Sequence, residues 1–212
     1  MRRTQWHLLT VIVIVVVIGF IAWAYPQLPE RVPSHWNIRG EIDGYSDPLT
    51  ASLLFPGLVV LVSGLMAVFS WKERNTAVAD ALAQMSTVMA VFLGCLHVII
   101  TLAALGYGFT VERWIAGLLG VLFAVISRQL VDVPQNGFIG FRTYWTLANP
   151  TVWTETHRLA ARWMAAGGIV IIVLALLPLP AEWLFGGMLA AIVVAVAYPM
   201  WYAYRRFHEL TV

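Results

Sequence analysis

The stretch LLTVIVIVVVIGFIAWAY, residues 8–25, decides which class of protein this chain belongs to. It carries no charged side chain. A helix of this length, at about 1.5 Å per residue, crosses most of a hydrocarbon core that is roughly 30 Å thick. No small-residue cleavage site of the A-x-A kind follows it, whereas further apolar runs do. The sequence therefore predicts an uncleaved membrane anchor rather than a signal peptide.

The composition of the whole chain extends this conclusion to all 212 residues, of which 60% are hydrophobic and 11% charged, with a mean hydropathy of +0.80. A water-soluble domain of this composition would expose a large apolar surface, so lipid must be the solvent. The sequence predicts an all-α fold, a polytopic membrane bundle of about six transmembrane helices within a single membrane domain, residues 1–212. The apolar runs lie at 8–25, 50–71, 84–106, 114–130, 162–179 and 182–203.

The lysines and arginines predict the orientation of this bundle. Six spans place both termini on one side. If that side is cytoplasmic, ten basic residues lie inside and three lie outside, namely Arg31, Arg39 and Arg113. We therefore expect both termini in the cytoplasm. The polar loop at residues 26–48 then faces outward, and the polar segment at residues 131–161 faces inward.

Several kinds of chemistry are absent from the sequence. Its one cysteine, Cys95, falls within the third apolar run, which excludes a disulfide framework and a thiolate metal cluster. No Walker A, Rossmann glycine, H-E-x-x-H or G-x-S-x-G pattern occurs, so we predict no catalytic residue, no cofactor and no metal site. The net charge of +2 comes mainly from the basic residues expected inside, and we expect no direct binding of nucleic acid.

The outer loop, LPERVPSHWNIRGEIDGYSDP at residues 28–48, is dense in polar and turn-forming residues. Its first prolines fix φ, so the chain should leave the first span stiff and extended. Asp43-Gly44 is a strong turn signal, and Asp47-Pro48 has the chemistry of a helix cap. The sequence therefore predicts a structured loop that ends on a capped helix.

The function of this loop has several possible readings. His35 could hold a divalent cation together with Asp43, Asp47 or Glu41, but the spacing fits no metal template. His35 and a carboxylate could also act as an acid–base pair, but no nucleophile accompanies them. Alternatively, the polar groups satisfy one another and the loop is a rigid plate that receives an extracellular ligand. We favour this docking role. Its candidate contacts are His35, Trp36, Asn37, Gly40 and Asp43.

The same loop carries a first resemblance. YPQLPERVPSHWNIRGEIDGYSDP, residues 25–48, resembles a short N-terminal domain of unknown function that is found in bacterial multi-span membrane proteins. The pattern of that domain is LP-x-x-(I/V)-P-x-H-(W/F)-N-x-x-G-x-x-D. The positions that match it, with the prolines in register, are His35, Asn37, Gly40 and Asp43.

The inner segment carries a second resemblance. PQNGFIGFRTYWTLANPTVWTETHRLAARW, residues 134–163, resembles the C-terminal signature of the SdpI immunity-protein family. One departure is Tyr144, where the family usually has proline, which leaves the local loop conformation open. The matching positions are Asn136, Gly140, Arg142, Thr143, Trp145, Thr146, Leu147, Trp153, Thr156, His157 and Arg158.

Local chemistry predicts how this inner segment folds. Asn149-Pro150 should cap a helix that runs on into the fifth span. One face of that helix should hold Trp153 and His157 together with Ala160, Ala161 and Met164. On the other side, Glu155 and Arg158 lie three residues apart and should pair weakly, at about 0.2–0.5 kcal/mol.

Two readings of this segment stay open. Arg142, Trp145, Trp153, His157 and Arg158 could form a pocket or docking surface for an anionic lipid headgroup or a partner protein. Alternatively, they are only the basic and aromatic residues that any cytoplasmic membrane surface collects.

His97 lies near the centre of the third span, where an ionisable group is costly. It could relay protons, or it could be a neutral side chain that bonds to Thr101 or to a backbone carbonyl. No carboxylate lies in the central part of any span. This favours the neutral role and weakens a carrier function.

The resemblance implies a function. Members of the SdpI family protect a bacterium from a membrane-active peptide toxin, and the founding member also holds a repressor at the membrane when toxin is bound. The implied partners are membrane lipid, an extracellular peptide toxin and a cytoplasmic repressor protein, at the bacterial cytoplasmic (inner) membrane. The oligomeric state is open. The alternative is a membrane enzyme or carrier for a lipid or small solute that uses His35, Asp43 and Arg142.

The charge bias generates a prediction about topology. In a Cys95→Ser background, a cysteine at Ser46 should react with a membrane-impermeant thiol reagent on intact cells, whereas one at Thr154 should not. Labelling is measured by gel shift. Labelling at Thr154 alone would overturn the orientation.

Overall fold

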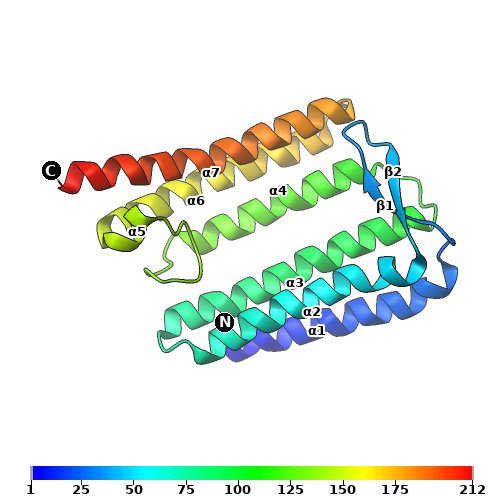
Figure 1. The fold of residues 1–212 in the computed structure, drawn as a ribbon, viewed down its shortest axis with the longest axis horizontal. Coiled ribbons are helices and arrows are strands. Elements are labelled where there is room, and N and C mark those ends of the chain that lie inside the picture. Colours follow the sequence, from blue (N-terminus) through cyan, green and yellow to red (C-terminus); the bar gives the residue numbers. More distant parts are fainter. Residues whose placement is uncertain (1, 212) are drawn as a thin grey trace.

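The computed structural model describes residues 2–211 and confirms the all-α membrane bundle, with one small β-hairpin added to it (Figure 1). The first part contains α1 (Arg3–Ala24), a 3₁₀ turn (Tyr25–Gln27), β1 (Val32–Trp36), β2 (Ile42–Ser46), α2 (Pro48–Lys72) and α3 (Thr76–Ala104). The second part contains α4 (Val111–Leu130), α5 (Tyr144–Ala148), α6 (Pro150–Leu176) and α7 (Ala181–Thr211).

Five helices, α1, α2, α3, α6 and α7, are long and apolar enough to cross a membrane. The fourth predicted span corresponds to α4, which runs alongside them and has 20 residues, enough for about 30 Å. It carries charged residues near both of its ends, namely Glu112, Arg113 and Arg128. The predicted six spans are thus five strongly apolar helices plus α4.

As predicted, one helix begins at Pro150 and continues into the fifth apolar run, since α6 spans Pro150–Leu176. The first turns of α6 carry polar and aromatic residues that a hydropathy pattern excludes from a span. Among them, Trp153, Thr156 and His157 are buried inside the protein. The predicted cap is confirmed, since the Asn149 side chain accepts hydrogen bonds from the backbone of Thr151 and Val152.

The helices form two groups of three, which we call the N-half (α1, α2, α3) and the C-half (α4, α6, α7) (Figure 1). In the C-half, α4 and α6 cross where Gly120 faces Gly168. A Cβ added to Gly120 would lie 2.7 Å from the Gly168 carbonyl oxygen, and one added to Gly168 would lie 2.6 Å from that of Gly120. Only glycine lets the two backbones approach this closely.

The N-half is joined by hydroxyl groups. The Ser63 hydroxyl donates to the Ser86 carbonyl at 3.5 Å, and the Ser86 hydroxyl donates to the Ser63 carbonyl at 3.2 Å. Thr10 and Thr87 share a hydrogen bond of 2.9 Å between α1 and α3. Such bonds hold helices together in lipid, where apolar faces have no water to escape.

The polar segments gather at the two ends of the bundle. The hairpin end holds β1, β2 and the turns at residues 105–110 and 177–180. The terminal end holds both ends of the described chain and the segment at residues 131–149, so the termini share one side as predicted. The predicted cap of α2 is also confirmed. The Thr50 backbone N–H donates to the Asp47 carboxylate at 3.0 Å. Hydrogen bonds from the side chain and then the backbone of Thr50 lower the pKa of that carboxyl.

The α4–α6 crossing generates a prediction about stability. Gly168→Ala should overpack the crossing and lower the unfolding free energy by about 1–3 kcal/mol, a fall of roughly 2–4 °C in Tm per kcal/mol. The control is Gly186→Ala on α7, where an added Cβ meets nothing within 4 Å. Thermal unfolding in detergent measures both. Equal Tm values for the two variants would contradict the crossing.

Candidate functional site

The outer loop folds as an antiparallel hairpin in which β1 pairs with β2, with His35 opposite Gly44 and Trp36 opposite Ile42. An added Cβ at Gly44 would lie 2.8 Å from the His35 Cβ, so glycine permits this close pairing. The extended backbone was predicted, but the strands were not. The expected extended backbone is not found at Pro26, which lies inside the 3₁₀ turn Tyr25–Gln27.

His35 and Asp43 form a latch across the two strands, with 2.5 Å between His35 Nδ1 and Asp43 Oδ1. The side chains are 70% and 44% exposed, so solvent screens the pair and its contribution to stability is small. Within residues 2–211, no third histidine, cysteine or carboxylate joins them in a group that could hold a metal ion. The latch is thus an exposed polar contact.

Asn37 and Gly40 build the turn between the strands. The Asn37 carbonyl oxygen accepts from the backbone N–H groups of Arg39 at 2.8 Å and Glu41 at 3.1 Å, and its amide donates to the Glu41 carboxylate at 2.8 Å. Gly40 adopts φ +77°, a conformation that side chains other than glycine rarely take. The motif positions of the loop therefore shape one rigid turn.

The hairpin, residues 32–46, reaches from one half of the bundle to the other (Figure 1). At its base, Val32 is 1% exposed where β1 packs on α2 and α3 of the N-half. At its tip, a Cβ on Gly40 would lie 3.3 Å from the Glu112 carboxyl carbon on α4 and 3.5 Å from the Ala181 Cβ on α7. We call this bridging element the hairpin strap.

At the terminal end, Asn136 closes the loop that follows α4. Its carbonyl oxygen accepts from the backbone of Phe138 at 2.7 Å and Ile139 at 2.8 Å. Its amide donates to the carbonyl of Pro134 at 2.7 Å. This side chain replaces the backbone partners that an irregular loop lacks.

His157 on α6 holds the next turn of the same loop. Its Nε2 accepts from the Phe141 backbone N–H at 2.9 Å, and its Nδ1 bonds to the Trp153 carbonyl at 2.7 Å. These two bonds require the neutral imidazole with its proton on Nδ1. Gly140, at φ +111°, leaves room for the ring, since a Cβ there would overlap His157 Nε2.

Trp153 ties this loop to the helices around it. Its ring stacks on His157 with centroids 4.0 Å apart, and its indole N–H donates to the Val133 carbonyl at 2.9 Å. The buried cluster around it joins Val133 and Ile139 to α3 residues such as Leu82. Residues 131–149 and the first two turns of α6 therefore also bridge the two halves, and we call them the terminal strap.

The short helix α5 is fixed by hydroxyl groups. The Thr143 side chain accepts from the Thr146 N–H at 3.3 Å, and the buried Thr146 hydroxyl donates to the Phe141 carbonyl at 2.6 Å. Gln135, which the sequence did not single out, donates to the carbonyls of Thr146 at 2.8 Å and Leu147 at 2.9 Å. Only the folded loop brings Gln135 to this helix, so no sequence signal marks it.

The structure divides the predicted site residues of the terminal strap into two sets. Asn136, Gly140, Thr146, Trp153 and His157 are brought together, and three of them, Thr146, Trp153 and His157, are buried. Arg142 and Arg158 are exposed at its surface, and Arg142 donates to the Phe138 carbonyl at 3.3 Å. Trp145 packs on Tyr204 of α7 with ring centroids 5.2 Å apart, away from the stacked pair.

One predicted contact, between Glu155 and Arg158, was wrong. Glu155 pairs with Arg206 of α7 at 2.7 Å and accepts from the Tyr202 hydroxyl at 2.9 Å, instead of pairing with Arg158. The packing of α6 on α7 turns Glu155 toward α7, which sequence spacing cannot show.

His97 forms no hydrogen bond to Thr101, one of the two partners considered for a neutral side chain at this position. Its Nδ1 is buried without a hydrogen-bond partner within residues 2–211. The ring instead packs against Phe20 of α1, with centroids 6.0 Å apart, and Phe55 of α2, at 6.3 Å.

Comparisons with known proteins match both straps. Residues 132–203 match the SdpI/YfhL protein family, and residues 12–60 match a domain of unknown function (DUF1648). The Immunity protein SdpI of Bacillus subtilis is 28% identical over 165 residues, which cover 76% of this chain and 78% of that protein. No solved structure matches significantly. The resemblance inferred from the two motifs is confirmed.

The contact between Gly140 and His157 generates a prediction. Gly140→Ala should force the ring off the Phe141 N–H and strain the backbone, which lowers the unfolding free energy by about 1–3 kcal/mol. Gly137→Ala in the same loop, where an added Cβ meets nothing within 4 Å, is the matched control. Hydrogen exchange at the Phe141 amide should accelerate in the first variant only. Unchanged exchange there would refute the proposed lock.

Proposed function

We propose that this chain is an immunity protein of the bacterial cytoplasmic membrane that protects its cell from a membrane-active peptide toxin, because residues 132–203 match the SdpI/YfhL protein family and most of the chain is similar to an immunity protein. The SdpI/YfhL match includes the terminal strap, the match to the domain of unknown function includes the hairpin strap, and the similarity to the immunity protein extends over 76% of the chain. We place both termini in the cytoplasm, so that the hairpin strap faces outward and meets the toxin first.

One observation carries this proposal, namely that the two motifs shared with the family bridge the N-half and the C-half at opposite ends. The hairpin strap runs from α2 and α3 to the tips of α4 and α7. The terminal strap packs Trp153 and Ile139 against α3. A ligand that shifts one strap therefore changes how the halves sit against each other, and rigid helices carry that shift to the other strap.

The surfaces of the straps supply the contacts for the two expected partners. His35, Asp43 and the half-buried Trp36 offer the toxin a polar and aromatic surface at the hairpin end. Arg142 and Arg158 are exposed at the terminal end, where guanidinium groups can bind carboxylates of a repressor or phosphates of lipid. The protein would thus both neutralise the toxin and report it.

The alternative enzyme or carrier gains no support from the geometry. Its three polar groups would have to share one site. His35 and Asp43 lie at the hairpin end, whereas Arg142 lies at the terminal end, with the length of the helices between them (Figure 1). They cannot act on the same atom of a lipid or solute.

Survival of cells tests the proposal. Expression of the chain in a strain sensitive to a membrane-active peptide toxin should raise survival. His35→Ala and Asp43→Ala should reduce that protection at normal membrane abundance, because the latch that shapes the toxin surface is lost. Ser34→Ala, exposed on the same strand, is the control. A chelator should have no effect. If a chelator removes protection and zinc or calcium restores it, the docking role is contradicted.

The same survival assay also tests the terminal strap. Arg142→Lys keeps the charge but loses the planar fork, so it should weaken the response if Arg142 binds a carboxylate or phosphate. Arg205→Lys, at the end of α7, is the control. A fully active Arg142→Lys protein would assign Arg142 to membrane orientation alone.

A further inference from the structure

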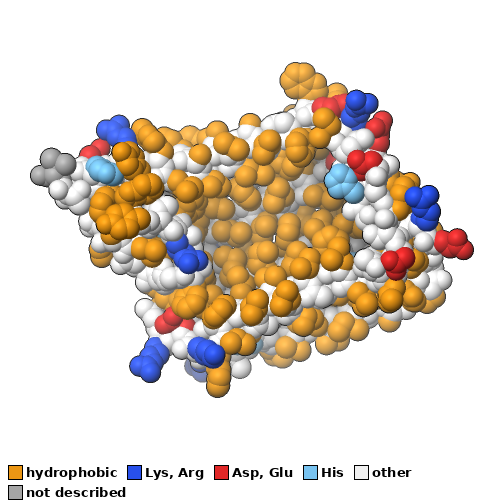
Figure 2. Space-filling view, in the orientation of Figure 1, with side chains coloured by type: hydrophobic (Ala, Val, Ile, Leu, Met, Phe, Trp, Pro, Cys, Tyr) orange, Lys and Arg blue, Asp and Glu red, His pale blue; other side chains and the backbone are white. Residues whose placement is uncertain are grey.

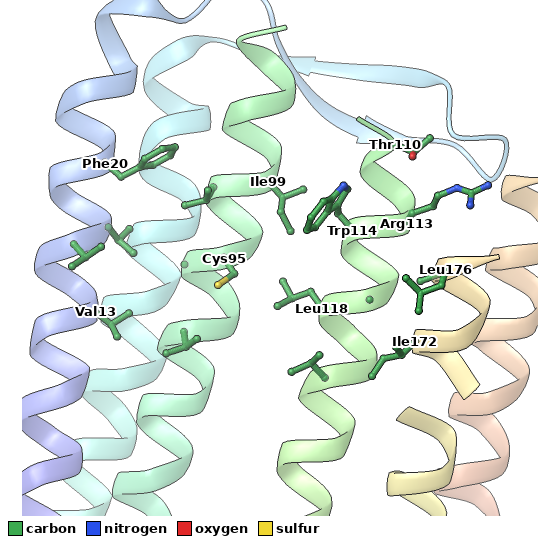
Figure 3. Close-up of a pocket in the computed structure, with 18 of the residues that line it drawn as sticks. Val13, Phe20, Cys95, Ile99, Thr110, Arg113, Trp114, Leu118, Ile172 and Leu176 are labelled. Atoms are coloured by element: carbon green, nitrogen blue, oxygen red, sulfur yellow. The ribbon is translucent and has the colours of Figure 1, made fainter. Parts of the chain in front are cut away.

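An apolar cleft separates the two halves between the straps (Figures 2 and 3). Its volume is ≈ 910 Å³, near the upper end of the roughly 300–1,000 Å³ of ligand sites. One wall is formed by α1 and α3, with Phe20 and Cys95, and the other by α4 and α6, with Leu118 and Ile172. The hollow opens on a side of the bundle parallel to the helices, where lipid lies (Figure 2).

The polar groups of the cleft are confined to its upper rim, below the hairpin strap (Figure 3). They are the Thr110 hydroxyl, the Arg113 guanidinium and the indole N–H of Trp114. Arg113 already donates to the carbonyls of Leu177 at 2.5 Å and Leu179 at 2.9 Å, so it fastens the α6–α7 turn. An occupant of the cleft must therefore be apolar along its length.

The hairpin end above the cleft is acidic. Six carboxylates lie in its loops and helix starts, against three arginines. Two of those arginines are engaged, since Arg113 bonds to carbonyls and Arg31 lies over the Tyr45 ring at 4.5 Å. This excess of negative charge attracts a cationic group and repels an anionic one. The carboxylates are Glu30, Glu41, Asp43, Asp47, Glu112 and Glu182.

We propose that the cleft binds an apolar helical peptide with a basic end, which enters sideways from the bilayer and leaves that end beneath the hairpin strap. This inference rests on the proposed function and assigns the toxin its site. A peptide in the membrane satisfies its backbone by forming a helix. Cys95 and Gly117 are small, and a Cβ on Gly117 would meet only Ala175 at 3.9 Å, so a helix can approach the walls closely.

A phospholipid is the competing occupant, and the charge pattern separates the two. An anionic headgroup would sit against the acidic hairpin end, whereas a basic peptide end would be stabilised there. The position of the hairpin strap, which crosses above the cleft from one half to the other, also gives bound peptide a direct route to the spacing of the halves (Figure 3). A single bound acyl chain is thinner than a helix and is already part of the bilayer, so its binding would not change the spacing of the two halves.

Cys95 provides the test, because it is the single cysteine of the sequence and lines the cleft. The full chain in phosphatidylcholine nanodiscs is treated with a membrane-permeant maleimide. The probe is a synthetic Leu–Ala helix of about 20 residues with a pair of lysines at one end. It should slow the modification of Cys95 saturably, by roughly tenfold at about ten times its Kd.

Two comparisons decide the identity of the occupant. The same helix ending in a pair of glutamates should give little protection, and added phosphatidylglycerol should give none. Equal protection by both peptides, protection by phosphatidylglycerol alone, or no protection by the lysine peptide would each overturn the proposal.

A filled cleft links this site to immunity. Leu118→Trp should abolish protection of Cys95 by the lysine peptide and reduce cell survival, whereas Val193→Trp, exposed on α7 away from the cleft, should do neither. If wild type and Leu118→Trp both protect cells while the peptide leaves Cys95 reactive, the cleft is refuted and the immunity function stands. If the peptide protects Cys95 but wild type confers no survival, the immunity function fails and the site stands.

Discussion

Lipid supplies no hydrophobic force that would press the two halves of this bundle together, because acyl chains are as apolar as the helix faces. Within each half, close backbone contact at Gly120 and Gly168 or hydroxyl bonds such as Ser63 to Ser86 hold the helices. Between the halves, the direct helix contact is α3 with α4, and an apolar cleft takes up much of the remaining boundary. The relative position of the halves therefore depends on the two polar straps.

The residue types of the terminal strap follow from its task of holding the two halves together. Its loop is irregular and partly buried, so each backbone group needs a partner from a side chain. Asn136 supplies two acceptor bonds and His157 supplies one, and the neutral ring can do so only because its other nitrogen bonds to the Trp153 carbonyl. Gly140 is required where the ring comes closest. The signature that marks the family in sequence is, in structure, a set of mutually satisfied bonds.

Sequence alone predicted what depends on local chemistry. Apolar runs gave the spans, and the caps at Asp47 and Asn149 gave helix starts, since both arise from residues close together in the chain. It failed where partners are distant, as with Glu155, whose ion pair with Arg206 needs α6 to pack on α7. It also missed the strands and the bridging path of the outer loop, because prolines and polar residues mask the alternation by which strands are recognised.

The two straps differ in strength, and this difference indicates where the molecule gives way. The His35–Asp43 latch is exposed, and exposed pairs contribute about 0–1 kcal/mol. The terminal strap is held by buried bonds around Trp153 and His157, and breaking a buried hydrogen bond costs about 1–3 kcal/mol for each group left without a partner. We therefore expect the hairpin end to open before the terminal end if the halves separate. The cleft reaches the hairpin end at Thr110 and Arg113. An occupant of the cleft therefore lies next to the hairpin strap, which is the weaker of the two connections between the halves.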